Sequence, residues 1–194
     1  MKLSPTREAL LEAACVLFYQ RGIHATSVDA ILEKAGVARQ SLYFHFTSKD
    51  GLIAEFLKVR DERWRGAMQR HIASAGGPGE KLLAIFDFLA AWFAEPDFHG
   101  CAFINTAVEY ADPQHPFHQL SAHHKALVRE EIRVLCSEAG LHDPAALANH
   151  LALLMEGAIV TEQVTPGSNA ARQARQIAEI LINRSKGETG ARVH

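Results

Sequence analysis

The fold is decided by the stretch Ala35-Gly36-Val37-Ala38-Arg39-Gln40-Ser41-Leu42-Tyr43-Phe44-His45-Phe46-Thr47-Ser48-Lys49-Asp50. Its first three residues predict a tight connection between two short helices, the second of which runs from about Arg39 to Phe46. Val37, Leu42 and Phe46 have the spacing to pack inward. Two short helices joined by a glycine-containing turn, with an earlier helix completing a core, predict a helix-turn-helix.

The residues on both sides of this stretch also follow a helical period. A first helix, which begins at Ser4-Pro5 and ends at Arg21-Gly22, has an inward face formed by Leu10, Ala14, Leu17 and Phe18. Thr26, with Asp29 three positions later, predicts the cap of a second, short helix. Ser48 is expected to cap a long fourth helix.

Helical stretches continue to the end of the chain. Apolar faces at helical spacing occur within residues 82–93, 117–127, 147–158 and 174–181, and the breaks between them carry glycine or proline. No run alternates apolar and polar residues for long enough to predict a strand. We therefore expect an all-α fold of about nine helices, with a helix-turn-helix domain over residues 1–50 and a second helical domain over residues 51–194.

The composition excludes several classes of protein. The chain has 194 residues with 20 Lys and Arg against 22 Asp and Glu, and its net charge of −2 excludes a polycation that coats nucleic acid. Residues 1–60 still hold eight Lys or Arg and six Asp or Glu, a modest basic excess. The cysteines, Cys15, Cys101 and Cys136, form no paired motif, and no apolar run is long enough for a membrane span or signal peptide. We therefore expect a reduced, cytoplasmic protein that does not enter a membrane.

The helix predicted over residues 39–46 has side chains suited to contact with DNA bases. Its outward positions are Arg39, Gln40, Ser41, Tyr43 and His45. Arginine forms paired hydrogen bonds with guanine and glutamine with adenine, so this face could contact bases in a major groove. Hydroxyl and ammonium groups are common donors to phosphate oxygens, and the side chains that suit this role are Ser27, Tyr43 and Lys49.

Residues 7–52 resemble the DNA-binding domain of the TetR family of transcriptional regulators. The family pattern runs from an AGV segment through hydrophobic-Tyr-x-His/Tyr-Phe to Ser/Asn-Lys-Glu/Asp, and residues 35–50 follow it in order and spacing. Upstream, the pattern is matched at Leu17-Phe18, Gly22, Thr26, Val28 and Ile31. This chain departs from the pattern at Ala38, where a capping serine is more usual, and at Gly51, where an acidic residue often begins the fourth helix.

The resemblance implies a homodimer that binds a near-palindromic operator in double-stranded DNA. Its two recognition helices would lie roughly 34–36 Å apart, about one DNA turn. Most members are repressors that a small molecule releases from DNA. The family's phosphate contacts fall on Ser27, Tyr43 and Lys49, and its base contacts fall on Arg39, Gln40, Ser41 and His45. Tyr43 could instead be partly a packing residue, and His45 could be a backbone contact or a surface histidine.

The second domain is expected to bind a hydrophobic or aromatic effector. Its segment from Gly100 to Glu109 resembles a GC-hydrophobic-hydrophobic-N-x-A-x-E segment that begins the sixth helix in one large subgroup of the family. Asn105 would be either a polar anchor in an apolar cavity or a brace between helices. The candidates for this site, between helices four and eight, are Trp64, Trp92, Phe103, Asn105, Phe117, His124 and Met155. An aromatic stripe at helical spacing is also typical of a core, so any of them could be a packing residue.

Dimerisation is expected through the last two long helices, which in this family form a four-helix bundle with their counterparts. The apolar faces of these helices are formed by Leu147, Leu151, Leu154, Ala158, Ala174, Ile177 and Leu181. In isolation these residues are only core stripes. Release from DNA would follow a shift of the fourth helix, which connects the DNA contacts near Ser48 to the effector near Trp64.

Two other functions are weighed against this hypothesis. A metal site could draw its ligands from a short segment that contains Asp112, His115, His118, His123 and His124. Pro113 and Pro116 make that segment irregular, and no paired-cysteine or HExxH pattern accompanies it. An enzyme is disfavoured because the chain has neither a Cys-His signature nor a phosphate-binding glycine loop. We therefore expect no metal, no cofactor and no catalytic activity.

Overall fold

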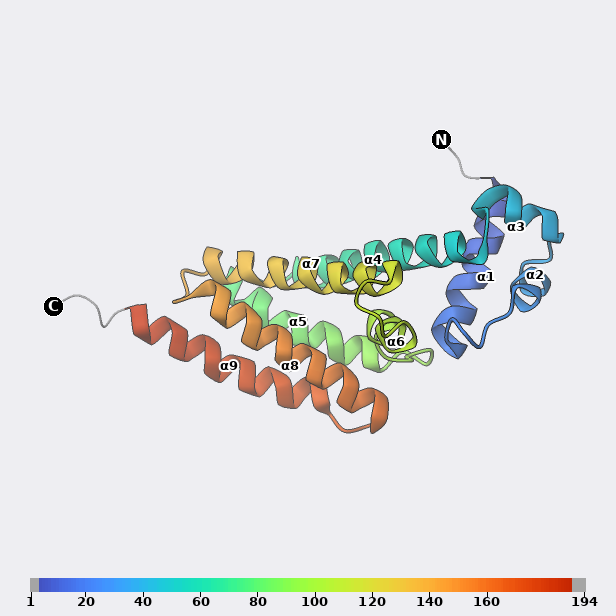
Figure 1. Ribbon diagram of the computed structural model, residues 1–194. Helices are drawn as coiled ribbons and strands as arrows, with labels where there is room; N and C mark the ends of the chain where they lie inside the picture. The colour runs from blue at the N-terminus through green and yellow to red at the C-terminus, as the bar shows by residue number, and fades with distance from the viewer. Residues whose placement is uncertain (1–3, 190–194) are drawn as a thin grey trace. The chain divides into compact units, whose positions relative to one another are not determined.

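A computed structural model describes residues 4–189 of the chain. These residues form nine α-helices and no strand (Figure 1), which confirms the all-α prediction. In chain order the helices are α1 (Pro5–Arg21), α2 (Val28–Ala35), α3 (Arg39–Phe46), α4 (Lys49–Ile72), α5 (Pro78–Phe93), α6 (Ala102–Glu109), α7 (Pro116–Glu138), α8 (Pro144–Val164) and α9 (Ala170–Thr189). The bounds of α3 are those predicted for the helix from Arg39 to Phe46.

The helices pack into two compact units, each built from two segments of the chain. The first unit holds residues 4–63 and 101–124, and the second unit holds residues 64–100 and 125–189. α4 and α7 each continue from one unit into the other. The expected boundary after residue 50, between a helix-turn-helix domain and a second helical domain, stays a prediction.

The first three helices form a small core within the first unit, where α1 packs against both α2 and α3. Ala14 of α1, Ile31 of α2 and Leu42 of α3 are fully buried. The ring of Phe18 lies 5.4 Å from that of Phe56 on α4, measured between centroids. Full burial of a large apolar side chain stabilises the fold by about 1.5–3 kcal/mol. This core therefore sets the positions of α2 and α3.

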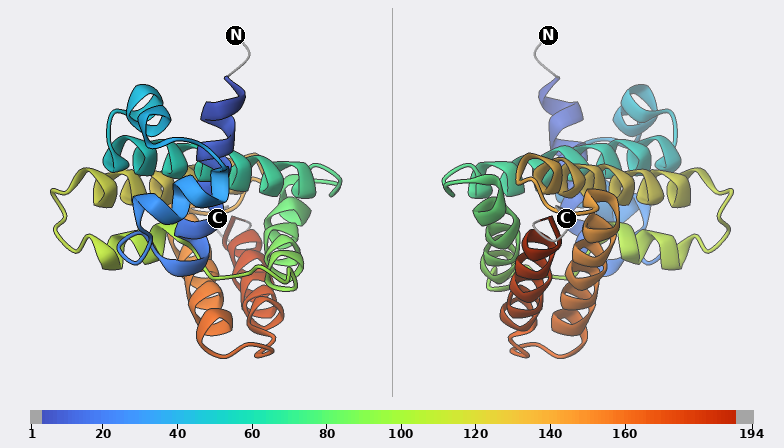
Figure 2. Two further views of the ribbon diagram at one scale, coloured as in Figure 1. Left: turned by 90° about the vertical axis from the view of Figure 1, so that its right-hand side faces the viewer. Right: turned by 90° about the vertical axis from the view of Figure 1, so that its left-hand side faces the viewer.

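The second unit is built around α5, α8 and α9, which pack against one another. Figure 2 shows α8 and α9 as adjacent antiparallel helices joined by a short turn. The buried face of α8 consists of Leu147, Ala148, Leu151, Met155, Ala158, Ile159 and Glu162. Among the described helices, α8 is the one whose length and composition would suffice to cross a membrane. Its packing against α5 and α9 accounts for the apolar residues on its buried face.

The start of α2 differs from its predicted cap by one residue. Ser27, not Thr26, is the N-cap, and its Oγ accepts a hydrogen bond from the backbone N–H of Ala30 at 3.1 Å. Thr26 is buried, and its hydroxyl donates to the carbonyl oxygen of Gly22 at 2.7 Å. Two adjacent hydroxyl residues could each cap the helix, and the threonine, whose methyl group suits the core, is the one that faces inward. The predicted cap of α4 is confirmed, because Ser48 Oγ accepts from the N–H of Gly51 at 3.1 Å.

Candidate nucleic-acid interface

α3 presents one face to the core of the first unit and the opposite face to solvent. Leu42 is fully buried on the inner face. Of the predicted base contacts, Arg39 and Gln40 are exposed, and Ser41 and His45 are half-buried. All four therefore keep surface that a DNA duplex could contact, and their side chains supply both donors and acceptors.

The Arg39 guanidinium is held beside two side chains of the helix pair. Its Nη2 forms an ion pair with Oδ1 of Asp29 on α2. A hydrogen bond with Tyr43, followed by the charge of Asp29, raises the pKa of Arg39. The ion pair is exposed, with 54% of the Arg39 side chain and 74% of the Asp29 side chain in solvent. Exposed ion pairs contribute little to stability, so a guanine edge could replace Asp29 as the partner of Arg39.

Phe44 also lies on the outward face of α3. It leaves 82% of its surface in solvent, the largest exposed fraction among the large hydrophobic residues that the structure describes. Its ring meets that of His45 edge-on, with 4.9 Å between centroids. No role is predicted for Phe44 from the sequence, although the helical period indicates its outward direction: two positions from Leu42 is about 200° around a helix. Phe44 gives this polar face an apolar component.

The residues predicted to contact phosphates have different surroundings. Ser27 is exposed at the start of α2, and because its Oγ caps the helix as an acceptor, its O–H can still donate to a phosphate. Tyr43 leaves 49% of its surface exposed. Lys49 begins α4, where its Nζ donates to the carbonyl oxygen of Ile23 at 2.8 Å and lies 5.9 Å from the centroid of the Phe18 ring. Lys49 therefore holds the connection between α1 and α2 in addition to any contact with DNA.

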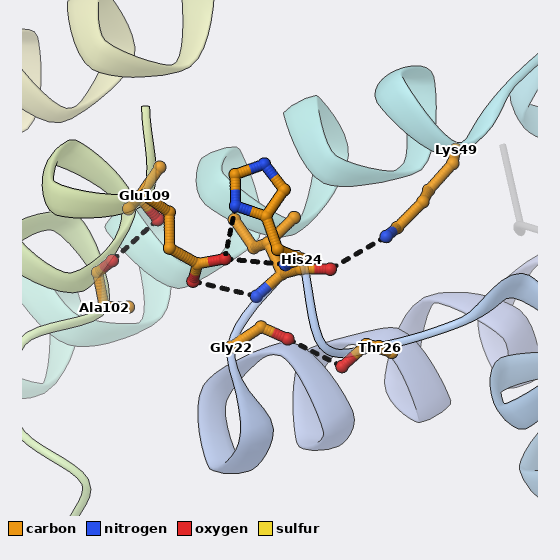
Figure 3. A network of polar contacts seen from close by, with 8 residues as sticks. Gly22, His24, Thr26, Lys49, Ala102 and Glu109 are labelled. Carbon is orange, nitrogen blue, oxygen red and sulfur yellow. Dashed lines mark hydrogen bonds and ion pairs between the residues drawn. The ribbon is translucent and has the colours of Figure 1, made fainter. Parts of the chain in front are cut away.

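One carboxylate, that of Glu109 at the end of α6, joins that helix to the connection between α1 and α2 (Figure 3). Its Oε1 accepts a hydrogen bond from the backbone N–H of Ile23 at 2.9 Å, and its Oε2 accepts one from the N–H of His24 at 2.6 Å. His24 Nδ1 lies 3.2 Å from the same Oε2. The motif around Glu109 was recognised from sequence, but these contacts were not, because their partners lie 86 and 85 positions away.

The predicted effector contacts in the first unit lie on α6 and α7. Phe103 and His124 are buried and stacked, with 3.7 Å between ring centroids and 12° between ring planes. His124 Nδ1 lies 2.6 Å from Oδ1 of Asp61 on α4. Phe117 is buried, and Asn105 is half-buried on α6. The structure thus brings Phe103 and His124 into contact.

The other three predicted effector contacts, Trp64, Trp92 and Met155, belong to the second unit. All three are buried. The rings of Trp64 and Trp92 meet edge-on, with 5.6 Å between centroids and 72° between planes. Such a geometry is typical of packed aromatic cores. The two tryptophans therefore contribute to the core of the second unit, and their contact with an effector stays a prediction.

The residues predicted for the dimer interface lie mostly on the inner faces of α8 and α9. Leu147, Leu151, Ala158 and Ala174 are buried within the chain, and Leu154 and Leu181 are half-buried. Ile177 is 47% exposed. A different set of apolar side chains faces solvent on this helix pair, and we call it the α8–α9 face: Leu153, Val160, Val164, Ile177 and Ile180. Only Ile177 belongs to both sets.

Two residues of the histidine-rich segment, His115 and His118, contact residues nearby in sequence. His115 Nδ1 accepts a hydrogen bond from the N–H of Phe117 at 3.2 Å, and His118 Nδ1 lies 2.9 Å from the carbonyl oxygen of Tyr110. Within residues 4–189, no three His, Cys, Asp or Glu side chains are grouped closely enough to hold a metal ion.

Two cysteines have thiols that resist ionisation. Burial raises the pKa of Cys15 and of Cys136 to about 11. A nucleophilic cysteine acts as a thiolate, so these two side chains are unsuited to catalysis at neutral pH.

Sequence comparison gives matches to two parts of the chain. Residues 10–56 match the family described as bacterial regulatory proteins, tetR family, and residues 78–178 match the Tetracyclin repressor-like C-terminal domain. The transcriptional regulator YjdC of Escherichia coli is 25% identical over 187 residues, which cover 95% of this chain and 97% of that protein. The transcriptional repressor KstR2 of Mycolicibacterium smegmatis is 38% identical over 80 residues, which cover 41% of this chain and 39% of that protein.

Solved structures resemble the chain over most of its length. A TetR-family transcriptional regulator from Streptomyces coelicolor superposes with a TM-score of 0.88 at 29% identity, covering 93% of this chain and 96% of its own. A tetR-type transcriptional regulator from Streptomyces avermitilis gives a TM-score of 0.83 at 30% identity, covering 95% and 99% of the two chains. The similarity therefore includes both the helix-turn-helix and the helices that follow it.

Proposed function

Because the chain belongs to the TetR family of transcriptional regulators, and is therefore not an enzyme, we propose that it represses transcription as a homodimer bound to a near-palindromic operator. The single observation that carries this proposal is the outward face of α3, which combines hydrogen-bonding side chains with an exposed aromatic ring. Two copies would place two α3 helices roughly 34–36 Å apart, in successive major grooves on one side of the duplex.

Direct base contacts come from the first turn and the middle of α3. Arg39 donates to a guanine edge after leaving Asp29, and Gln40 pairs with an adenine edge. Ser41 and His45 contact neighbouring bases, and the exposed ring of Phe44 packs against a thymine methyl group. These contacts select the sequence. Contacts with phosphates from Ser27, Tyr43 and Lys49 fix the position of α3 without selecting a base.

The dimer forms through the α8–α9 face. Leu153 and Val164 leave 73% and 75% of their surfaces in solvent, and Ile180 leaves 59%. Burial of apolar surface against a second copy is favourable by about 25 cal/mol per Å². The dimer also doubles the number of phosphate contacts, which a single copy with so modest a basic excess needs for useful affinity.

A small hydrophobic or aromatic effector releases the dimer from DNA. Within the first unit, the stacked rings of Phe103 and His124, with Phe117 and the half-exposed amide of Asn105 nearby in sequence, suit an apolar ligand with one polar group. The effector acts by preferring the arrangement in which the two α3 helices are wrongly spaced. The shift reaches α3 through α4, which continues from one unit into the other.

The experiment that tests this function is selection of bound duplexes from random DNA. The purified full-length chain is incubated with a random library, bound DNA is amplified over several cycles, and the enriched sequence is measured for affinity at several salt concentrations. We expect an inverted repeat with half-site centres about 10–10.5 base pairs apart and a dissociation constant that rises steeply with salt. Failure to enrich any sequence would contradict the proposal. The cytoplasm, where the three cysteines stay reduced, is the compartment in which this function would operate.

A further inference from the structure

The connection between α1 and α2 determines where α2 begins. Ser27 caps α2 directly after this connection, and α2 in turn packs against α3. The connection is short, so a displacement of residues 22–26 would move the start of α2. Contacts that hold these residues in place therefore also affect the position of the outward face of α3.

Three groups hold the connection: one from α4, one from α6 and one from the connection itself (Figure 3). Lys49 of α4 donates to the carbonyl oxygen of Ile23, and Thr26 bonds back to Gly22 at the end of α1. The third group is Glu109 of α6, which accepts hydrogen bonds from two successive backbone N–H groups. Hydrogen bonds to an ionised carboxylate are roughly twice as strong as those between neutral groups, and the Glu109 side chain is only 21% exposed.

The chain is built to bring this carboxylate close. Gly22 has φ of +87°, a conformation that favours glycine, and a Cβ at this position would lie 3.0 Å from Glu109 Oε1. The ring of Tyr110 lies 4.7 Å from that of His24, so a second contact accompanies the carboxylate. Burial first, and then the charges of Asp50 and Glu109, raise the pKa of Tyr110. The end of α6 is thus fitted to residues 22–24 by backbone, charge and ring contacts together.

We propose that Glu109 is a positioning residue for DNA binding, which acts from outside the helix-turn-helix by holding the α1–α2 connection and, through it, α2 and α3. The inference rests on the proposed contact of α3 with DNA. It links α6, which also carries Phe103 and Asn105, by hydrogen bonds to the connection that precedes α2.

Whether removal of Glu109 weakens or strengthens DNA binding distinguishes a positioning role from simple charge repulsion. DNA repels carboxylates, so removal of a negative charge from the first unit should by itself strengthen DNA binding. If Glu109 positions α3, its removal should weaken binding instead. Glu33, an exposed carboxylate on α2, is the matched control, because Glu33→Gln removes the same charge from the same unit.

The experiment measures operator affinity of four full-length proteins: the wild type, Glu109→Gln, Glu109→Ala and Glu33→Gln. Affinity is measured per folded molecule, well below each melting temperature, over a series of salt concentrations. Glu109→Gln keeps one acceptor oxygen for Ile23, so we expect it to weaken binding less than Glu109→Ala, for which about a tenfold loss is expected. The salt dependence should stay at the wild-type slope because no phosphate contact is removed. Glu33→Gln should bind as tightly as the wild type or tighter.

Amide exchange supplies a second readout. The N–H groups of Ile23 and His24 should exchange faster in both Glu109 variants, while amides of the α8–α9 pair keep their wild-type rates. If Glu109→Ala fails to fold, Glu109→Gln still decides the matter. Operator affinity of Glu109→Gln equal to or above that of the wild type would overturn the inference. A wild-type protein that binds no operator would instead overturn the proposed function on which the inference rests.

Discussion

The outward face of α3 and the α8–α9 face both leave large side chains in solvent, but their chemistry differs. The α3 face carries Arg39 and Gln40 beside the exposed ring of Phe44. The α8–α9 face carries aliphatic side chains such as Leu153 and Val164. Base edges offer hydrogen-bonding groups and thymine methyl groups, which match the first face. An aliphatic surface is best matched by another aliphatic surface, and a second copy of the same chain supplies one.

The largest effect is expected from a charge placed on the α8–α9 face. Leu153→Asp should prevent dimerisation, because a buried carboxylate without a partner is strongly unfavourable. Operator affinity should then fall by more than about a hundredfold, since the second half-site is lost. Sedimentation measures the first effect and operator binding the second. Ala126→Asp, at an exposed position of α7, adds the same charge elsewhere and should leave both unchanged. A Leu153→Asp protein that remains dimeric would show that the dimer does not form through the α8–α9 face.

Arg39→Ala should have the next largest effect, a loss of about 1–3 kcal/mol in operator affinity with relaxed preference at one base of each half-site. Binding to a panel of duplexes with single-base changes measures both quantities. The control is Asp29→Asn, which removes the negative charge that pairs with Arg39 in the free protein while leaving the guanidinium in place. It should preserve the base preference. Equal losses in all duplexes after Arg39→Ala would show that Arg39 contacts phosphate alone.

Glu162 offers a test confined to the α8–α9 pair. Its carboxylate accepts hydrogen bonds from Ser168 Oγ and the N–H of Gly167, each at 2.6 Å, and the bond from Ser168, followed by those from Gly167 and Ala170, holds the pKa of Glu162 below its ordinary value of 4.5. A lowered folded pKa means that this stabilisation is complete above the unfolded pKa and is lost as pH falls through the folded pKa. Glu162→Gln should therefore cost about 1 kcal/mol of unfolding free energy at pH 7, and the difference should shrink in acid.

Urea unfolding at pH 7 and at acid pH measures this difference. Glu130→Gln is the control, because Glu130 is exposed on α7 and pairs only with its neighbour Arg133 in the bonds described, so its removal should change stability less. Base preference should be unaffected by either substitution. A change in base preference after Glu162→Gln would mean that the α8–α9 pair influences α3 more directly than we propose.

The smallest effect concerns a single methyl group. Replacement of the contacted thymine by uracil removes one methyl, and operator affinity should fall by about 0.8 kcal/mol per half-site. In the Phe44→Ala protein the thymine and uracil duplexes should bind equally, because the ring that contacts the methyl is gone. A double-mutant cycle of protein and DNA measures the coupling. No coupling at any thymine would show that the exposed ring of Phe44 has another partner.

Much of the fold could be predicted because its signals are local. The bounds of α3 and the inward direction of Leu42 follow from helical period and a glycine turn, both of which lie within a few residues. The cap of α2 was displaced by one residue because Thr26 and Ser27 both carry a hydroxyl, and only burial decides between them. Local pattern thus predicts which elements form, but not which of two similar neighbours faces the core.

The candidate site was less predictable, because its contacts join distant parts of the chain. The partners of Glu109 lie 85 and 86 positions away, so no local pattern reveals them. The exposed apolar residues on the outer side of α8 could not be predicted for a different reason. Both sides of this helix are apolar, with Leu151 on the inner side and Leu153 on the outer side. Apolar residues at helical spacing therefore predict which side of α8 forms the core, but they do not identify the α8–α9 face.

Operator spacing tests whether two copies joined by the α8–α9 face place two α3 helices on one operator. The measurement is the affinity of the wild-type protein for its selected operator and for the same duplex with about five base pairs, half a turn, inserted between intact half-sites. We expect the insertion to weaken binding by more than about a hundredfold, because the second α3 then faces the wrong side of the duplex. Unchanged affinity after the insertion would show that the two α3 helices do not bind one operator together.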